Sequence, residues 1–227
     1  MSRFACLTLC ACIVAAVSGA SSTFASPVPW SNPSGSAATF DWANGQSQNG
    51  LFGSPTVVQD SLVFFPSSFK AESENGASAQ SSDRLEFTIY AKPGLMVQEV
   101  RISEWGNYSI TGSGSVNVIG ALDVKNLLTN AQASAAMVTT PAMPLVASSN
   151  TSGVWEGSAA TILPSGWTEI HVVFDSTLAT TSGGSSASSI HKSGTDALVV
   201  TVAIPEPSCA ALLIGSGALL LRRRRAQ

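Results

Sequence analysis

The sequence predicts an all-β fold, an antiparallel β-sandwich of the jelly-roll or immunoglobulin type, with a removable segment at each end. Apolar and polar residues alternate with a period of two over several short segments, as in strands with one buried face. Gly-rich turns separate these segments, and the runs of helix that a parallel sheet would need do not come between them. All four cysteines lie in the end segments, so burial and backbone pairing must hold the domain together.

The first part of the domain is the least regular. Residues 26–50 are rich in Ser, Gly, Asn and Pro, which predicts an irregular start or an edge strand. The short apolar segments 55–59 and 62–66 are predicted strands. Residues 71–83 are expected to form a polar loop with a turn at Asn75-Gly76.

The middle of the chain has the strongest strand pattern. Residues 85–90 read Leu-Glu-Phe-Thr-Ile-Tyr, in which every second side chain is a large apolar one suited to the core. Residues 96–103 and 116–125 repeat this alternation. Turns are expected at 92–94 and 112–114, where Gly interrupts the pattern.

The last part of the domain mixes clear and ambiguous segments. Residues 126–150 contain Leu127-Leu128 and scattered alanines, which fit either a short helix or a loop packed on the sandwich. Residues 168–175 alternate and predict a strand, whereas the low-complexity segment 180–189 predicts a loop. Residues 196–204 are nearly apolar throughout, as expected for a central strand.

The N-terminal segment has the features of a secretory signal peptide. A positively charged start precedes the apolar core 4–17, and small residues follow it. The core is shorter than the roughly 20 apolar residues that a spanning helix needs. We expect export through the Sec machinery and cleavage by signal peptidase between Ala25 and Ser26, with cleavage after Ala20 as the alternative.

The C-terminal segment combines three elements in a fixed order. A rigid motif comes first, consisting of Ile204, Pro205, Glu206, Pro207 and Ser208. The apolar run 209–221 follows; at about 1.5 Å per residue its helix would be too short for a permanent span of a hydrocarbon core about 30 Å thick. The chain then carries a block of positive charge, expected to stay cytoplasmic by the positive-inside rule, at Arg222, Arg223, Arg224 and Arg225.

This tail resembles the PEP-CTERM sorting signal of bacteria with exosortase systems. In that family a Pro-Glu-Pro motif precedes a short transmembrane segment and an Arg-rich end; Ile204 stands where Val is more common. The resemblance implies recognition by an exosortase, a membrane transpeptidase similar to Cys proteases, followed by removal of the tail. It implies an inner-membrane intermediate, and then delivery to the cell surface or the extracellular matrix.

The chain is accordingly divided into a signal peptide (1–25), a β-sandwich ectodomain (26–203) and a sorting segment (204–227). The stretch 62–108, which includes Ala-Lys-Pro-Gly at 91–94, is similar to a recurring ectodomain pattern among PEP-CTERM proteins. That family is known as secreted β-domains without an assigned reaction, so the resemblance transfers no catalytic residue.

The amino-acid composition restricts the kinds of partner that are expected. Charged residues make up only 11% of the chain, and the net charge is −3. The Arg block accounts for four of the eleven basic residues, so the ectodomain without it is more acidic still. This balance excludes nucleic acid as an expected partner. The membrane is expected to be a transient partner, through the C-terminal helix alone.

Few residues carry recognisable chemistry. In the strand 168–175, Glu169, His171 and Asp175 share the face opposite the core, a weak metal patch that is better interpreted as a solvated sheet face. His191, beside Lys192, is expected at the surface. The carboxylates that could form a glycosidase pair are interpreted as solubilising charges; they are Glu99, Glu104, Glu156 and Asp175.

The sequence has no nucleophile elbow, calcium loop or phosphate loop, so no catalytic, cofactor-binding or metal-binding residue is predicted. The expected function is a non-enzymatic surface or matrix protein. The alternative is a glycan-binding module for extracellular polysaccharide, because tryptophans at turns can stack on sugar rings; a hydrolase comes third. The tryptophans are Trp30, Trp42, Trp105, Trp155 and Trp167, and the simpler expectation is that they plug the core.

Overall fold

The computed structural model describes residues 26–194 and 197–205 of the chain. The predicted signal peptide, the apolar run 209–221 and the Arg block lie outside the described residues, as do Ala25 and the motif residues after Pro205. None of the described residues forms a helix that could cross a membrane.

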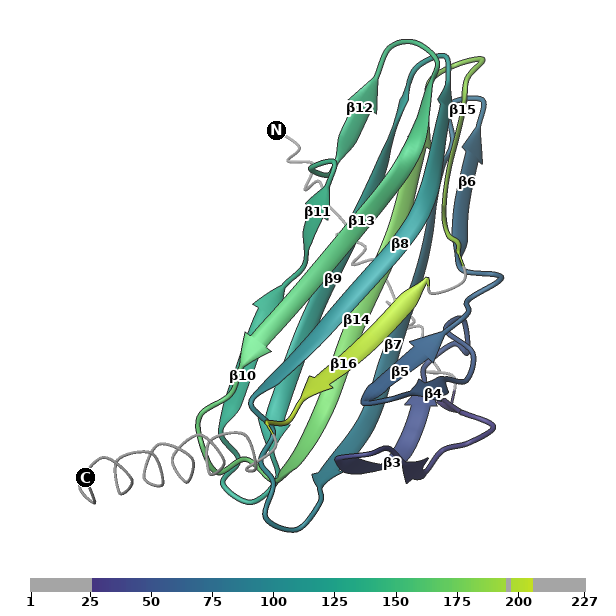
Figure 1. Ribbon diagram of the computed structural model, residues 1–227. Helices are drawn as coiled ribbons and strands as arrows, with labels where there is room; N and C mark the ends of the chain where they lie inside the picture. Colours follow the sequence, from purple (N-terminus) through teal and green to yellow (C-terminus); the bar gives the residue numbers. More distant parts are fainter. Residues whose placement is uncertain (1–25, 195–196, 206–227) are drawn as a thin grey trace, which may run out of the picture.

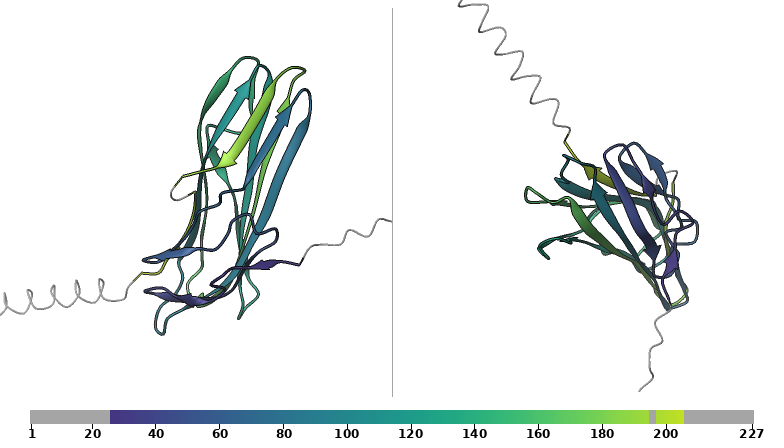
Figure 2. Two further views of the ribbon diagram at one scale, coloured as in Figure 1. Left: turned by 90° about the vertical axis from the view of Figure 1, so that its right-hand side faces the viewer. Right: turned by 90° about the horizontal axis from the view of Figure 1, so that it is seen from below.

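The described part of the chain is all-β, which confirms the predicted class. Strands in two antiparallel sheets pack face to face, and the long strands run along the length of the molecule (Figures 1 and 2). The strands are β1 (Val28–Pro29), β2 (Gly35–Ser36), β3 (Phe40–Ser47), β4 (Thr56–Val58), β5 (Ser61–Phe64), β6 (Lys70–Glu74), β7 (Ser78–Ala91), β8 (Glu99–Thr111), β9 (Gly114–Asn126), β10 (Gln132–Ala136), β11 (Val138–Thr140), β12 (Leu145–Ala147), β13 (Thr151–Ile162), β14 (Glu169–Ser182), β15 (Ala187–Lys192) and β16 (Leu198–Ala203).

Each sheet is built on long central strands. Sheet A has the order β1-β3-β7-β14-β9-β10, with β12 also on β9 and β2 also on β3. Sheet B has the order β11-β13-β8-β16-β5-β4, with β15 placed between β6 and β8. The predicted central position of the last strand is confirmed, because β16 pairs with both β5 and β8.

Strand β8 changes its partner halfway along its length. Its first half, up to Glu104, pairs with β16, and its second half, from Gly106, pairs with β15 (Figure 1). At the change, the Trp105 amide donates a hydrogen bond to the Ala197 carbonyl (3.1 Å), and the Ser193 amide donates to the Trp105 carbonyl (3.2 Å). The end of β15 therefore lies beside the middle of β8.

The core between the sheets is rich in aromatic rings. Trp30 packs edge-on against Phe64 with ring centroids 5.2 Å apart, and Phe52 packs in the same way on Phe69 at 5.2 Å. Full burial of one such ring is worth about 1.5–3 kcal/mol. The alternation predicted for 96–103 fails at its start, because Met96 is 42% exposed and β8 begins only at Glu99. Elsewhere the predicted inward residues are fully buried: Leu85, Phe87, Ile89, Val100, Ile102, Ile170, Val172 and Phe174.

Two segments expected to be loops are largely strands. Residues 71–83 form β6 and the start of β7, although the turn at Asn75-Gly76 is confirmed, with φ of 54° and 83°. Residues 180–189 contain the end of β14 and the start of β15. The inward positions of both segments carry small or polar side chains instead of the large apolar ones that usually mark a strand. The buried polar ones are Ser73, Asp83, Thr180, Ser182 and Ser188.

The short helix that was one of two predictions for residues 126–150 is not formed. The Asn126 side chain accepts hydrogen bonds from the amides of Leu128 (2.8 Å) and Thr129 (3.0 Å), a local turn that competes with helix formation. The chain then passes from β10 on sheet A to β11 on sheet B and back to β12 on sheet A. This segment closes one side of the sandwich.

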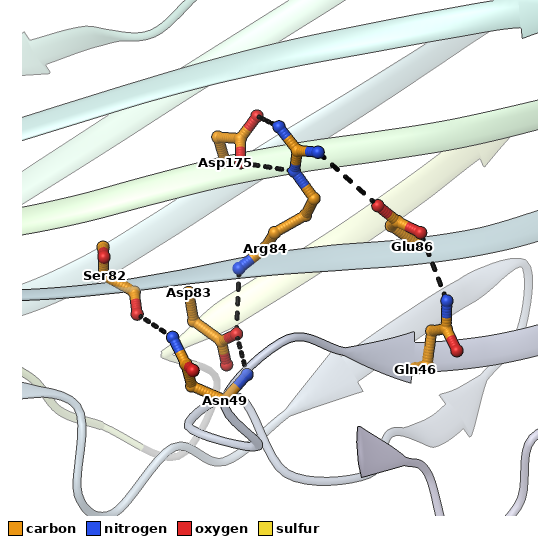
Figure 3. A network of polar contacts seen from close by, with 7 residues as sticks. All are labelled: Gln46, Asn49, Ser82, Asp83, Arg84, Glu86 and Asp175. Carbon is orange, nitrogen blue, oxygen red and sulfur yellow. Dashed lines mark hydrogen bonds and ion pairs between the residues drawn. The ribbon is translucent and has the colours of Figure 1, made fainter. Parts of the chain in front are cut away.

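Asp83 holds the first part of the chain onto sheet A (Figure 3). Its side chain is 3% exposed and accepts hydrogen bonds from the backbone amides of Asn49 (2.7 Å), Leu51 (2.7 Å) and Phe52 (3.3 Å). A buried carboxylate needs such donors, and the amides of a buried loop need acceptors. These hydrogen bonds hold the loop that contains Phe52 in place, with the Phe52 ring packed in the core.

Arg84, the next residue, makes a contrasting contact on the outer face (Figure 3). Its guanidinium donates two hydrogen bonds to Asp175, of 2.8 and 3.0 Å, and lies 3.8 Å from Glu86. The hydrogen bond to Asp175 raises the pKa of Arg84 above its ordinary value. Both side chains are more than two fifths exposed to water, so the pair contributes less than about 1 kcal/mol to stability.

These two aspartates allow a matched test of what holds the N-terminal part. Asp83→Ala is expected to lower the free energy of unfolding by on the order of 3 kcal/mol, because several buried amides lose their acceptor. Asp175→Ala is expected to cost less than about 1 kcal/mol. Urea unfolding midpoints at a constant slope measure both; equal losses for the two variants would contradict this account.

Candidate functional site

A polar cluster lies inside the apolar core, and we call Glu104, Ser176 and Lys192 the core cluster. The three residues are 0%, 1% and 3% exposed. Lys192 Nζ donates hydrogen bonds to Glu104 Oε1 and to Ser176 Oγ, the latter at 2.8 Å. Ser176 Oγ donates in turn to Glu104 Oε2 at 3.1 Å. The three side chains thus form a closed ring of contacts.

The sheet register brings the core cluster together. Lys192 is the last residue of β15 and lies opposite Gly106 of β8, so Glu104 is its diagonal neighbour on the same face of sheet B. Ser176 reaches the pair from the other layer, because it belongs to β14 of sheet A. The cluster therefore connects both sheets across the core.

Aromatic rings enclose the Lys192 amine. Its Nζ lies 4.5 Å from the ring centroid of Phe69, 5.3 Å from that of Phe52 and 5.8 Å from that of Trp155. Gly106 makes room for the indole, because a Cβ there would lie 2.4 Å from Trp155 Nε1 and 2.1 Å from a backbone oxygen. The cation faces π systems instead of water.

Burial dominates the electrostatics of the core cluster. Loss of hydration lowers the pKa of Lys192 below its ordinary value, against the opposing effects of Glu104 and, at longer range, of Asp83. Taking two charges out of water costs several kcal/mol for each ion, which their attraction repays only with good geometry. Burial therefore favours the neutral amine of Lys192, while the contact with Glu104 favours the ammonium.

The sequence expectation for one charged residue is corrected here. Glu104 was interpreted as a solubilising surface charge, and it is buried; Lys192, for which no separate prediction was made, is buried as well. The alternation itself indicated this position, since Glu104 has the same parity as Val100 and Ile102, and Lys192 follows Ile190 by two residues. Residue type, which places Glu and Lys in water, pointed the other way.

The remaining candidate carboxylates are not brought together as a catalytic pair. Glu99 pairs with Arg101 at 2.7 Å, and Asp175 pairs with Arg84. Glu156 is exposed on the face of sheet B opposite to Glu104. The glycosidase interpretation, which needs two carboxylates flanking one bond, finds no such pair among these four residues.

His171 lies where the alternation placed it. It shares the outer face of β14 with Glu169 and Asp175, and all three are half-buried. Asp175 is engaged by Arg84, and the described ranges contain no group of three or more potential metal ligands. His191 also lies on an outer face, inside β15 and not at a loop junction.

Most of the tryptophans fill the core, as the simpler expectation had it. The indole of Trp105 is half-buried and reaches the surface. The exposed row of rings that a sugar-binding platform would present is therefore not formed. The buried tryptophans are Trp30, Trp42, Trp155 and Trp167.

The outer face of sheet B has two shallow hollows. The first, of about 270 Å³, lies over β6, β15 and β8 and is lined by hydroxyls with Glu72 and Glu74. The second, of about 120 Å³, lies over β8, β13 and β11. Its lining combines Trp105 with Glu156 and the hydroxyls of Ser103, Thr140 and Ser158.

The start of the sorting motif lies at the edge of the core. Ile204 is buried, and Pro205 is exposed next to it. Ser26, at the other predicted processing point, is exposed as well.

Comparison with known proteins gives little to add. No family model matches the chain, and no curated protein matches it. A solved structure of TmCBM61 in complex with β-1,4-galactotriose is 11% identical over 76% of this chain and 97% of that chain, with a TM-score of 0.23. The enzymatically active domain of bacteriophage CBA120 tailspike protein 4 is 8% identical over 59% of this chain and 19% of that chain, with a TM-score of 0.21. Likeness at this level supports no inference about function.

The role of Gly106 can be tested directly. Gly106→Ala is expected to displace Trp155 from its place over Lys192 and to lower the free energy of unfolding by about 1–3 kcal/mol. Gly184→Ala is the control, because a Cβ there meets nothing within 4 Å. Thermal or urea unfolding measures both variants. If Gly106→Ala is no worse than Gly184→Ala, the tight packing described here is wrong.

Proposed function

We propose that this chain is an exported, non-enzymatic protein of the cell surface or extracellular matrix, which an exosortase processes at Pro205, Glu206, Pro207 and Ser208. In the sequence, the C-terminal motif directly follows the last strand of the β-sandwich. The β-sandwich is then the domain that is exported, and the segments at both ends direct its export and sorting.

The observation that carries the proposal is the junction between β16 and the motif. Strand β16 is held by β5 and β8, and Ile204 is still part of the core. The chain reaches the surface at Pro205, and proline ends strand pairing because it has no amide hydrogen to donate. Cleavage just after this point would leave all the described core residues, Ile204 included, in the domain.

The processing can be tested on protein from the native host. Intact-mass analysis of the surface form is expected to place its C-terminus between Pro205 and Ser208, because cleavage at the motif removes everything beyond it. Glu206→Ala is expected to retain the Arg block at Arg222–Arg225, since the motif would no longer be recognised.

Glu74→Ala is the matched control for this test, because Glu74 is an exposed glutamate in the domain. It is expected to be processed as the unchanged protein is. Mature surface protein that still carries the Arg block would contradict the proposal.

A glycan-binding role is the second candidate, and the hollow at Trp105 is the observation in its favour. The indole of Trp105 is accessible there beside hydroxyls and the Glu156 carboxylate. Aromatic faces pack on sugar rings, while hydroxyl and carboxylate groups bind the sugar hydroxyls. A single ring and a shallow surface fit weak binding to a chain of sugars.

Binding to a panel of extracellular polysaccharides tests this second candidate. Trp105→Ala is expected to weaken Kd about tenfold through the loss of the stacking contact. Thr201→Ala, which changes an exposed residue of β16 that lines neither hollow, is expected to bind as before. If no polysaccharide changes the tryptophan fluorescence of the unchanged protein, the glycan-binding role is excluded for that panel.

A further inference from the structure

We propose that Lys192 and Glu104 become joined by an intramolecular amide bond, formed inside the folded domain without another enzyme. The bond would link the side chain of the last residue of β15 to that of its diagonal neighbour on β8. The proposal does not depend on the sorting or glycan-binding roles.

Contact and confinement are the first argument. Lys192 Nζ is hydrogen-bonded to Glu104 Oε1, and the two side chains are 3% and 0% exposed. Groups held in contact with the right orientation react as if at effective concentrations of about 10⁵ M or more. The folded core thus holds the two reacting groups in contact, whereas two free side chains in water would meet only rarely.

The protonation states favour the reaction. Amide formation needs a neutral amine and a neutral carboxylic acid. Within the buried pair, transfer of one proton from the ammonium to the carboxylate produces both groups and removes two charges from an apolar core. The desolvation that lowers the pKa of Lys192 acts in this direction.

Ser176 is placed to move the proton that the reaction releases. Its Oγ accepts a hydrogen bond from Lys192 Nζ at 2.8 Å and donates one to Glu104 Oε2 at 3.1 Å. It can therefore take a proton from the attacking nitrogen while giving its own to the departing oxygen. Relays of this kind accelerate proton transfer typically by about 10²–10⁴-fold.

The balanced step is a condensation. The Lys192 Nζ lone pair attacks Glu104 Cδ, and the C–N bond forms as the bond from Cδ to Oε2 breaks. Both protons of the departing water reach Oε2 through Ser176, the first from the ammonium before the attack and the second from the attacking nitrogen. Oε2 then leaves as water. No oxidant, reductant or co-reactant is required, and the product is a neutral amide.

Phe52, Phe69 and Trp155 enclose the Lys192 amine. The rings exclude bulk water from the amine, which keeps the nucleophile unsolvated. Conversion to an amide also removes the desolvation cost of the two charges, so the folded domain is stabilised by the reaction.

The test measures the mass of the full-length chain after expression and purification, with its termini established by peptide mapping. The expected mass is that of the sequence less one water molecule. After denaturation and trypsin digestion, cleavage at Lys192 is expected to be blocked. The peptide 102–125 should then be joined to a peptide that begins at Asn126 and continues past Lys192.

A mass equal to that of the sequence, with normal cleavage at Lys192, would overturn the proposal and leave a non-covalent ion pair. This outcome is read on the unchanged protein, so it does not depend on whether a variant folds. Variants then locate the bond. Lys192→Met should abolish the loss of water, whereas Lys70→Met, which changes an exposed lysine, should keep it.

Two further variants separate chemistry from packing. Glu104→Gln could release only ammonia at this position, so a loss of water that persists in this variant overturns the assignment. Ser176→Ala is expected to slow formation of the bond about 10²-fold, followed as the linked fraction against time in folded protein. An unchanged rate would overturn the relay.

Discussion

The contact among Glu104, Ser176 and Lys192 is the constraint on which the rest of the sandwich depends. Three polar groups in a core of aromatic rings must satisfy one another, because water does not reach them. Their contact fixes the register of β15 on β8 and the distance of β14 from sheet B. It also requires Gly106 opposite Lys192, since a larger residue would collide with Trp155.

A large part of the fold could be predicted from the sequence, because alternation is a direct consequence of the pleat. The strands around Phe87, Ile102 and Val172 were recognisable, since large apolar residues marked the buried face. The start of β7 and all of β15 were harder to recognise. Few of their inward positions carry large apolar residues: they are Ala79, Ser81 and Asp83 in β7, and Ser188, Ile190 and Lys192 in β15.

The core cluster could not be predicted from residue types alone. Glu104 and Lys192 occupy inward positions by parity, but burial of either residue alone would be very costly. Only their pairing makes both positions tolerable, and one sequence does not show that two strands 88 residues apart in the chain meet there. Burial of most of the tryptophans was easier to predict, because a large ring at the end of a strand commonly packs inward.

The position of β16 has a mechanical consequence. Force applied to the chain at Pro205 would enter the domain along the axis of β16, between β5 and β8. The hydrogen bonds between β16 and its neighbours lie across that direction, so they would be sheared together and would share the load. A strand peeled from its end would instead lose these bonds one at a time. A domain of this design suits a tether at its C-terminal end, because β16, the first strand to be loaded, is paired on both sides and passes the force to β5 and β8.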